Sequence, residues 1–235
     1  MIVTGASQGI GAGVVKAFLA RGYDVVGTAR SATKSKELSA SEHLALIDGD
    51  IGQFETAQKV AEVTIKQFGS IDAVVANAGI FLVKPFTEYT ADDFRALVST
   101  NLVGFIYITQ LAVKQMQAQK TGGSIVSITA ALVDNPIAGV TASLSMITKG
   151  GLNAAMRSLA MEYAKEHIRF NAVAPGTVDT PLHAKDSEDS LKTLSPMGSI
   201  SSVEDIAGAV VYLTEARQIT GEVLHVDGGA HIGKW

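Results

Sequence analysis

The stretch that most constrains this chain is Thr4-Gly5-Ala6-Ser7-Gln8-Gly9-Ile10-Gly11, which follows the apolar run Met1-Ile2-Val3. The apolar run is typical of a buried strand, and residues 12–20 are typical of a helix with one apolar side. A helix start offers unpaired N–H groups and the positive end of a dipole, so a pyrophosphate docks there when no side chain blocks it. The spacing T-G-x-x-x-G-x-G therefore predicts a phosphate-binding turn. The alternative is a glycine loop that only turns the chain.

The composition narrows the classes of protein. A chain of 235 residues can bury one substantial core, and its 47% hydrophobic and 18% charged residues indicate a buried sheet rather than disorder. The net charge of −4, with no basic run, argues against a nucleic-acid partner. Because there is no cysteine, we expect no disulfide, no thiolate chemistry and no cysteine-ligated metal, and the composition fits a cytoplasmic location. We also predict no metal site of another kind. No apolar stretch is expected to reach the length of a membrane span, so we expect no membrane partner.

Apolar runs and amphipathic stretches alternate along the chain. Strands are predicted at 1–3, 23–28, 44–51, 71–76, 124–129, 168–173 and 222–226, with helices at 12–20, 53–68, 94–116, 145–165 and 203–212. This alternation predicts a doubly wound parallel sheet of about seven strands with helices on both faces, a single-domain Rossmann α/β fold over residues 1–235. The polar, serine-rich segment 182–202 is predicted to be a lid or substrate loop.

The second predicted strand ends in Ala29-Arg30-Ser31. In dinucleotide folds an acidic side chain near this point holds the ribose 2′-hydroxyl of NAD, but Ala29 stands here, followed by an arginine. A guanidinium beside small hydroxyl residues suits a 2′-phosphate. We therefore predict NADP(H) rather than NAD(H). The alternative is a surface arginine that closes a strand.

Five motifs in order give the chain a resemblance to the short-chain dehydrogenase/reductase family over essentially its whole length. They are the glycine turn with Asp50, the turn Asn77-Ala78-Gly79, Asn101 within a helix, Pro175-Gly176 with Thr180, and Val226-Asp227-Gly228-Gly229. The resemblance implies an oxidoreductase that binds a nicotinamide nucleotide. The cofactor-binding residues that it implies are Gly5, Ser7, Gln8, Gly9, Ile10, Gly11, Arg30, Ser31, Asp50, Ile51, Asn77, Ala78, Gly79, Lys149, Pro175, Gly176, Val178 and Thr180.

The chain departs from this family where the chemistry is expected. Members carry Tyr-x-x-x-Lys at the start of a long helix, and here Ser145 stands four residues before Lys149. Members also carry a serine after the fifth strand, and here that position is Ala130, preceded by Thr129. The resemblance thus implies Lys149, Asn101, Ser145 and Thr129 as the candidate catalytic residues. A serine hydroxyl is less acidic and shorter than a phenol, so Ser145 would need a water to reach a substrate oxygen.

Two hypotheses follow. In the first, the chain transfers hydride between NADP(H) and a small carbonyl or alcohol substrate, with Ser145, Thr129 or a water on Lys149 as the altered proton donor. In the second, it binds the nucleotide with little turnover, as a sensor or partner subunit. The helices around 96–116 and 145–165 predict a homodimer or homotetramer, as in the family. His183 is interpreted as a loop histidine, Asp134 as a turn residue, and His225 as a strand residue near a subunit contact.

Overall fold

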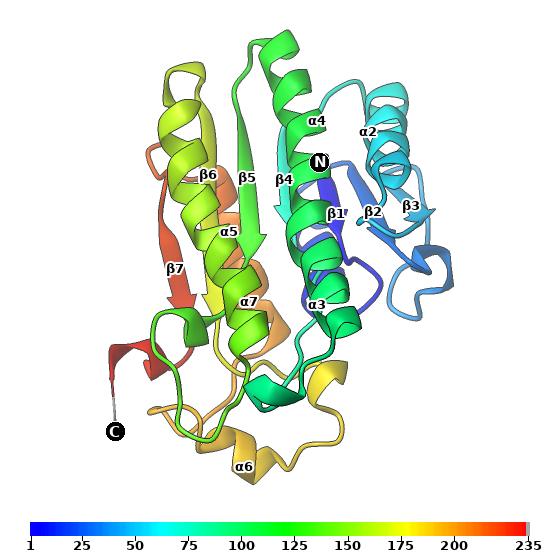
Figure 1. Cartoon of the computed structure of the whole chain (residues 1–235). Helices are drawn as coiled ribbons and strands as arrows, with labels where there is room; N and C mark the ends of the chain where they lie inside the picture. The colour runs from blue at the N-terminus through cyan, green and yellow to red at the C-terminus, as the bar shows by residue number, and fades with distance from the viewer. Residues whose placement is uncertain (234–235) are drawn as a thin grey trace.

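Seven parallel strands form one sheet in the order β3-β2-β1-β4-β5-β6-β7. The computed structural model describes residues 1–233. Figure 1 shows every strand pointing the same way, so that their carboxyl ends meet at one edge. The strands are β1 (Ile2–Thr4), β2 (Val25–Ala29), β3 (Leu44–Asp48), β4 (Ala73–Ala76), β5 (Gly123–Ile128), β6 (Ile168–Pro175) and β7 (Val223–Val226). The predicted doubly wound α/β fold is confirmed.

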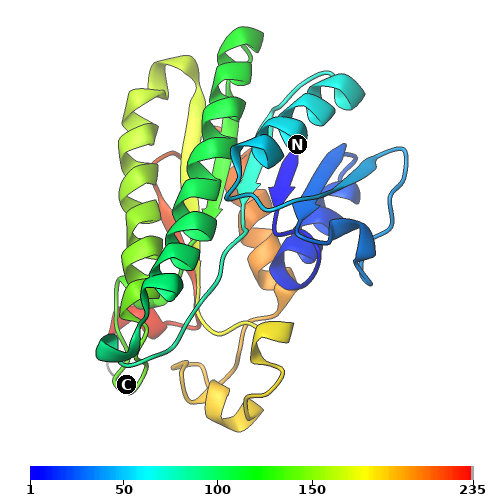
Figure 2. The same cartoon turned by 45° about the vertical axis from the view of Figure 1, so that its right-hand side comes forward.

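Helices cover both faces of the sheet. The helices of the chain are α1 (Gly9–Leu19), α2 (Phe54–Phe68), α3 (Ala91–Leu97), α4 (Gly104–Gln119), α5 (Ser143–Glu162), α6 (Glu188–Lys192) and α7 (Val203–Glu215). One core cluster unites α2, α4 and α5 with the sheet, and the other unites α1 and α7 with the opposite face. In the turned view of Figure 2, α4 and α5 lie side by side in front of the sheet while α7 lies behind it. Burial on both faces explains why the strands are continuous apolar runs.

The sheet changes direction of winding at β1. This strand pairs with β2 on one side and with β4 on the other. Connections that leave β1 and β4 therefore turn to opposite faces, which opens a crevice beyond their carboxyl ends. The glycine turn follows β1 and the Asn77-Ala78-Gly79 turn follows β4, so the sheet order brings these two motifs together.

The structure differs from the sequence predictions in the helix expected at 94–116. α3 ends at Leu97, and a π-helical segment (Val98–Val103) joins it to α4. The whole run Ala91–Gln119 is 29 residues long and passes the length and composition test for a membrane span, so the expectation that no stretch reaches that length was wrong. In this fold Ile108, Ala112 and Met116 on the run belong to the buried core.

The segment predicted as a lid contains short helical turns. A 3-10 turn (Pro181–His183) begins it, and α6 lies within it. Figure 1 shows the segment crossing below the carboxyl ends of the strands. It is therefore placed beside the crevice, as a substrate loop would be.

Close packing of α1 against α7 gives a prediction about stability. A Cβ on Gly13 would lie 2.1 Å from Cγ1 of Val203, whereas a Cβ on Gly208 of α7 would meet nothing within 4 Å. We expect Gly13→Ala to lower the free energy of unfolding by about 1–3 kcal/mol through overpacking. The matched Gly208→Ala is expected to raise it by roughly 0.5–1 kcal/mol, since alanine is the better helix former. Urea unfolding of both variants measures this, and equal effects would contradict it.

Candidate functional site

The glycine turn is closed by backbone contacts that leave no room for side chains. Gly5 and Gly9 adopt the left-handed conformation, with φ of 66° and 56°. A Cβ on Gly11 would lie 2.1 Å from the Gly5 carbonyl oxygen and 2.6 Å from Nδ2 of Asn77. Only glycine fits these positions. The turn therefore holds the first N–H groups of α1 toward the crevice edge, as a phosphate cradle requires.

Asn77 joins the two turns at the crevice. Its Nδ2 donates to the carbonyl oxygens of Thr4 (3.0 Å) and Gly5 (3.1 Å). In return, Oγ1 of Thr4 accepts from the backbone N–H groups of Asn77 (3.1 Å) and Ala78 (3.0 Å). The Asn77 side chain is thus used within the fold, where it fixes the shape of the glycine turn.

The end of β2 presents a free cation. Arg30 is exposed, and within residues 1–233 its guanidinium has no ion-pair partner. Ser31 beside it is also exposed. The neighbouring carboxylate, Asp48 at the end of β3, accepts from the backbone N–H and Oγ1 of Thr33 at 2.8 and 2.6 Å, and these bonds lower the pKa of Asp48. This corner of the crevice is therefore able to receive an anion at Arg30.

The other predicted cofactor-binding residues lie around the same edge of the sheet. Asp50 is exposed, and its Oδ1 accepts from the Gly52 N–H at 2.9 Å, while Ile51 is buried. A Cβ on Gly9 would lie 3.4 Å from Cβ of Thr180, so the chain just before the segment 182–202 lies against the glycine turn. The remaining members of the set follow β1 (Ser7, Gln8 and Ile10), β4 (Ala78 and Gly79) and β6 (Pro175, Gly176 and Val178).

Lys149 is the buried cation of the site. Its Nζ donates to the Ile128 carbonyl at 2.7 Å, at the carboxyl end of β5. A Cβ on Gly79 would lie 3.0 Å from this Nζ, so the ammonium packs directly on the turn after β4. Burial lowers the pKa of Lys149 to about 8. The ammonium is therefore able to exchange a proton near neutral pH.

Asn101 lies beside Lys149, on the π-helical segment. Its Oδ1 accepts from the Ile80 N–H at 2.8 Å, and its Nδ2 donates to the Ile80 carbonyl (3.0 Å) and to Oγ1 of Thr148 (2.9 Å). A Cβ on Gly79 would lie 3.3 Å from this Oδ1. Local π-helical turns are frequent at functional sites because they redirect one side chain. The structure thus brings Asn101 and Lys149 together at Gly79.

The hydroxyl groups of Ser145 and Thr129 are both used by the backbone. Oγ of Ser145 accepts from the Leu82 N–H at 2.9 Å and donates to the Leu82 carbonyl at 3.0 Å, and the residue is fully buried. Oγ1 of Thr129 donates to the Val173 carbonyl at 3.3 Å. Ala130, at the end of β5, has no hydroxyl. These contacts hold the two hydroxyls in the walls of the site.

Two further residues lie near these groups. The Tyr89 hydroxyl donates to the Leu82 carbonyl at 2.8 Å, the same carbonyl that Ser145 contacts. Glu37 accepts the Gly9 N–H on Oε1 at 3.1 Å, and its Oε2 forms an ion pair with Lys16 at 2.9 Å. Sequence reasoning missed Glu37, because it lies in an irregular segment with no motif to mark it.

The Glu37 carboxylate shows what the start of α1 attracts. The positive end of the helix dipole and the Gly9 N–H, which has no partner inside the helix, together favour a negative charge at this point. In the folded chain a side-chain carboxylate takes that place. The start of α1 is therefore suited to the phosphates of a dinucleotide, and the Glu37 carboxylate would compete with a phosphate for the Gly9 N–H. Among residues 1–233, no group of three histidine or acidic side chains is arranged to hold a metal ion.

Comparison with known proteins agrees with this fold. Residues 5–231 match the family model described as enoyl-(acyl carrier protein) reductase. The chain is 36% identical to carbonyl reductase family member 4 of Xenopus tropicalis over 232 residues, which cover 98% of this chain and 97% of that protein. It is 32% identical to L-rhamnose 1-dehydrogenase (NAD(P)(+)) of Sphingomonas sp. strain SKA58 over 246 residues, which cover 99% and 96%.

A solved structure shares the architecture. The structure of ElxO with NADP bound has a TM-score of 0.92 and 30% identity, and the match covers 99% of this chain and 98% of that one. The chain therefore belongs to the short-chain dehydrogenase/reductase family and is an oxidoreductase of that family.

The competing carboxylate leads to a prediction about binding. We expect Glu37→Gln to tighten NADP⁺ binding by about two- to fivefold, because it removes a negative charge worth roughly 0.3–1 kcal/mol at the start of α1. Glu42→Gln, in the same segment but paired with His43 at 3.4 Å, is the control and is expected to change nothing. Isothermal titration with NADP⁺ measures both variants. Weaker binding by Glu37→Gln would show that Glu37 supports the cradle instead.

Proposed function

We propose that this chain is an NADP(H)-dependent oxidoreductase of the short-chain dehydrogenase/reductase type, acting on a small carbonyl or alcohol substrate. The bound nicotinamide would supply or accept the hydride. One observation supports the proposal: the buried ammonium of Lys149 packs on Gly79, and the turn that contains Gly79 packs on the glycine turn. A Cβ on Gly79 would lie 3.0 Å from Nζ of Lys149, and a Cβ on Gly5 would lie 2.8 Å from Cα of Ala78. The turn proposed to bind the phosphates and the cation proposed to bind the nicotinamide ribose thus lie close together.

The preference for NADP(H) rests on the anion-binding corner at β2. Arg30 is exposed and without an ion-pair partner in the described chain, and Ser31 adjoins it. A forked guanidinium binds a 2′-phosphate through charge-assisted hydrogen bonds. The names of the relatives are compatible with this, because ElxO holds NADP and the Sphingomonas rhamnose dehydrogenase uses NAD(P)⁺.

The proposed cofactor site consists of the set predicted from the sequence. The glycine turn with Ser7, Gln8 and Ile10 would hold the pyrophosphate, and Asp50, Ile51, Asn77, Ala78 and Gly79 would line the adenine side. Pro175, Gly176, Val178 and Thr180 would flank the nicotinamide. Lys149 would donate to the hydroxyls of the nicotinamide ribose.

The proposed catalytic set is Lys149, Asn101, Ser145 and Thr129, and the geometry ranks its members as proton sources. Ser145 and Thr129 both spend their hydroxyl hydrogens on backbone carbonyls. Lys149 has three N–H bonds, and one of them reaches Ile128. We therefore favour a water on the Lys149 ammonium as the group that gives its proton to the substrate oxygen in reduction. The ammonium then replaces that proton, with Asn101 fixing the backbone around it.

A second candidate function is nucleotide binding with little turnover, as a sensor or partner subunit. The observation that favours it is the pairing of the Ser145 hydroxyl with the N–H and carbonyl of Leu82, which leaves no side-chain hydroxyl directed at a substrate from that position. The two functions separate in one assay: NADPH binding is followed by fluorescence, and NADPH oxidation is followed against a panel of carbonyl compounds. Binding without oxidation by wild type, with turnover gained in Ser145→Tyr/Ala130→Ser, supports the second function.

We also propose a homodimer or homotetramer built through α4 and α5. Ile106 on α4 is 43% exposed, and Ile147 and Met161 on α5 are 56% and 81% exposed. Large apolar side chains grouped on neighbouring helices are typical of surfaces that another subunit covers. Figure 1 shows these two helices side by side on the same face of the sheet.

The cofactor preference predicts an asymmetric effect at Arg30. We expect Arg30→Asp to weaken NADPH binding by about 10- to 100-fold, because charge-assisted bonds to a 2′-phosphate are worth roughly 1.5–3 kcal/mol. NADH, which lacks that phosphate, is expected to bind as before or more tightly. Fluorescence titration of both nucleotides measures the ratio, with the exposed and distant Arg217→Asp as control. An equal loss for both nucleotides would refute the preference.

Because we propose that the proton comes from Lys149, we expect the rate of carbonyl reduction to follow the charge of this group. Burial lowers the pKa of this group to about 8, so the charged form that reduction requires is present below pH 8 and disappears above it. The rate of carbonyl reduction is therefore expected to fall as pH rises through about 8. Lys149→Met is expected to lower kcat/KM by about 10²–10⁴-fold, and the exposed Lys165→Met to leave it unchanged. If Lys149→Met kept the same fall in rate near pH 8, Lys149 would not be the proton source.

A further inference from the structure

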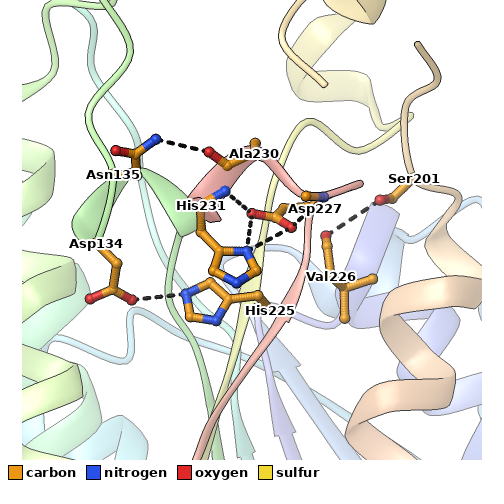
Figure 3. A network of polar contacts seen from close by, with 9 residues as sticks. Asp134, Asn135, Ser201, His225, Val226, Asp227, Ala230 and His231 are labelled. Carbon is orange, nitrogen blue, oxygen red and sulfur yellow. Dashed lines mark hydrogen bonds and ion pairs between the residues drawn. The ribbon is translucent and has the colours of Figure 1, made fainter. Parts of the chain in front are cut away.

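Two histidines and two aspartates form a linked cluster at the carboxyl edge of the sheet, outside the proposed catalytic set. The rings of His225 (β7) and His231 stack with centroids 3.8 Å apart and planes 14° apart. Nε2 of His225 lies 2.8 Å from Oδ2 of Asp134, and Nδ1 of His231 lies 2.9 Å from Oδ2 of Asp227. Figure 3 shows the two rings face to face, each joined to its own carboxylate.

The cluster joins two parts of the chain that are distant in sequence. Asp134 follows the 3-10 turn Ala131–Val133 after β5, whereas Asp227 and His231 belong to the turn that follows β7. A second bond strengthens the junction, since Nδ2 of Asn135 donates to the Ala230 carbonyl at 3.0 Å. Figure 3 shows this bond beside the histidine pair. The turn after β7 therefore holds the chain immediately beyond β5.

The segment held in this way leads into the proposed active site. Residues 134–142 run from the end of β5 to the start of α5, which carries Ser145 and Lys149. The Thr141 carbonyl accepts from the Lys84 N–H at 2.7 Å, so the segment also touches the chain after Gly79. A Cβ on Gly150 of α5 would lie 3.4 Å from Cγ1 of Val133. Movement of the segment would therefore alter the entrance to the crevice.

Within residues 1–233, each ring contacts one carboxylate and the other ring. The carboxylates are those of Asp134 and Asp227, and each ring faces the other. On β6, the neighbouring strand, His225 lies opposite the uncharged Ala174. On α5, which covers this face, the charged residues are Lys149, whose Nζ donates to Ile128, and the exposed Arg157 and Glu162.

The ring of His225 is held from two sides. One side bonds to the Asp134 carboxylate, and one face stacks on the His231 ring, which is itself held by Asp227. These contacts fix the orientation in which His225 meets Asp134.

We propose that His225, supported by His231 and Asp227, is a positioning residue whose bond to Asp134 holds residues 134–142 at the substrate entrance. The role in substrate positioning rests on the proposed function, but the grip of His225 on the segment does not.

Hydrogen–deuterium exchange on the whole chain tests the grip without any assay of activity. At one fixed pH, we expect residues 134–142 to exchange about three- to tenfold faster in His225→Leu and in Asp134→Ala than in wild type, because the bond between His225 and Asp134 is lost. The control is His43→Leu, which removes another histidine–aspartate pair of 2.7 Å (with Asp24) far along the chain and is expected to leave the exchange of residues 134–142 unchanged. Equal exchange of this segment in wild type and in His225→Leu would overturn the proposal.

A kinetic measurement then tests positioning. We expect His225→Leu to raise the KM for a carbonyl substrate by about threefold or more at one fixed pH, with its affinity for NADPH unchanged. Faster exchange of residues 134–142 in His225→Leu, together with a wild type that binds no nucleotide, would refute the proposed function and leave the grip of His225 standing. An unchanged KM in an active His225→Leu would refute the positioning role alone.

Discussion

The contact on which the site depends is the approach of two strand ends, β1 and β4, through Asn77. Its carboxamide donates to the carbonyls of Thr4 and Gly5, and the threonine hydroxyl accepts the N–H groups of the opposite turn. These bonds satisfy backbone groups that the ends of the strands would otherwise leave unpaired. They also fix the glycine turn at the start of α1. Any side chain at Gly11 would enter this space, so the turn and the neighbouring strand can only be built together.

The charges at the crevice are arranged around that fixed turn. Arg30 is exposed at one end, and Lys149 is buried at the other. Burying an ammonium with one carbonyl acceptor is costly, and the cost appears as the lowered pKa of Lys149. A ligand that offers further acceptors would relieve it. Glu37 acts in the opposite sense, because its carboxylate satisfies the start of α1. Lys149 thus has N–H bonds left for a ligand, whereas the Glu37 carboxylate already occupies the Gly9 N–H.

Much of this arrangement could be predicted from the residues. Continuous apolar runs alternating with amphipathic stretches are sufficient for the sheet, and the order of the motifs is sufficient to place Asn101 and Lys149 in one crevice. The π-helical segment around Asn101 could not be predicted, because it depends on bonds to Ile80 and Thr148 that form only in the folded chain. Glu37 and the histidine pair were missed for the same reason. His225 and Asp134 are 91 residues apart, and nothing in the local sequence pairs them.

If the structure works as proposed, the glycine turn and Lys149 together hold a nicotinamide dinucleotide phosphate. The decisive measurement is isothermal titration of the full chain with NADP⁺ near pH 7, followed by a crystal structure of the complex. We expect one nucleotide per chain, with its pyrophosphate on the N–H groups at the start of α1 and its nicotinamide ribose within hydrogen-bond distance of Lys149. No heat at millimolar nucleotide, or a nucleotide bound away from both groups, would contradict it.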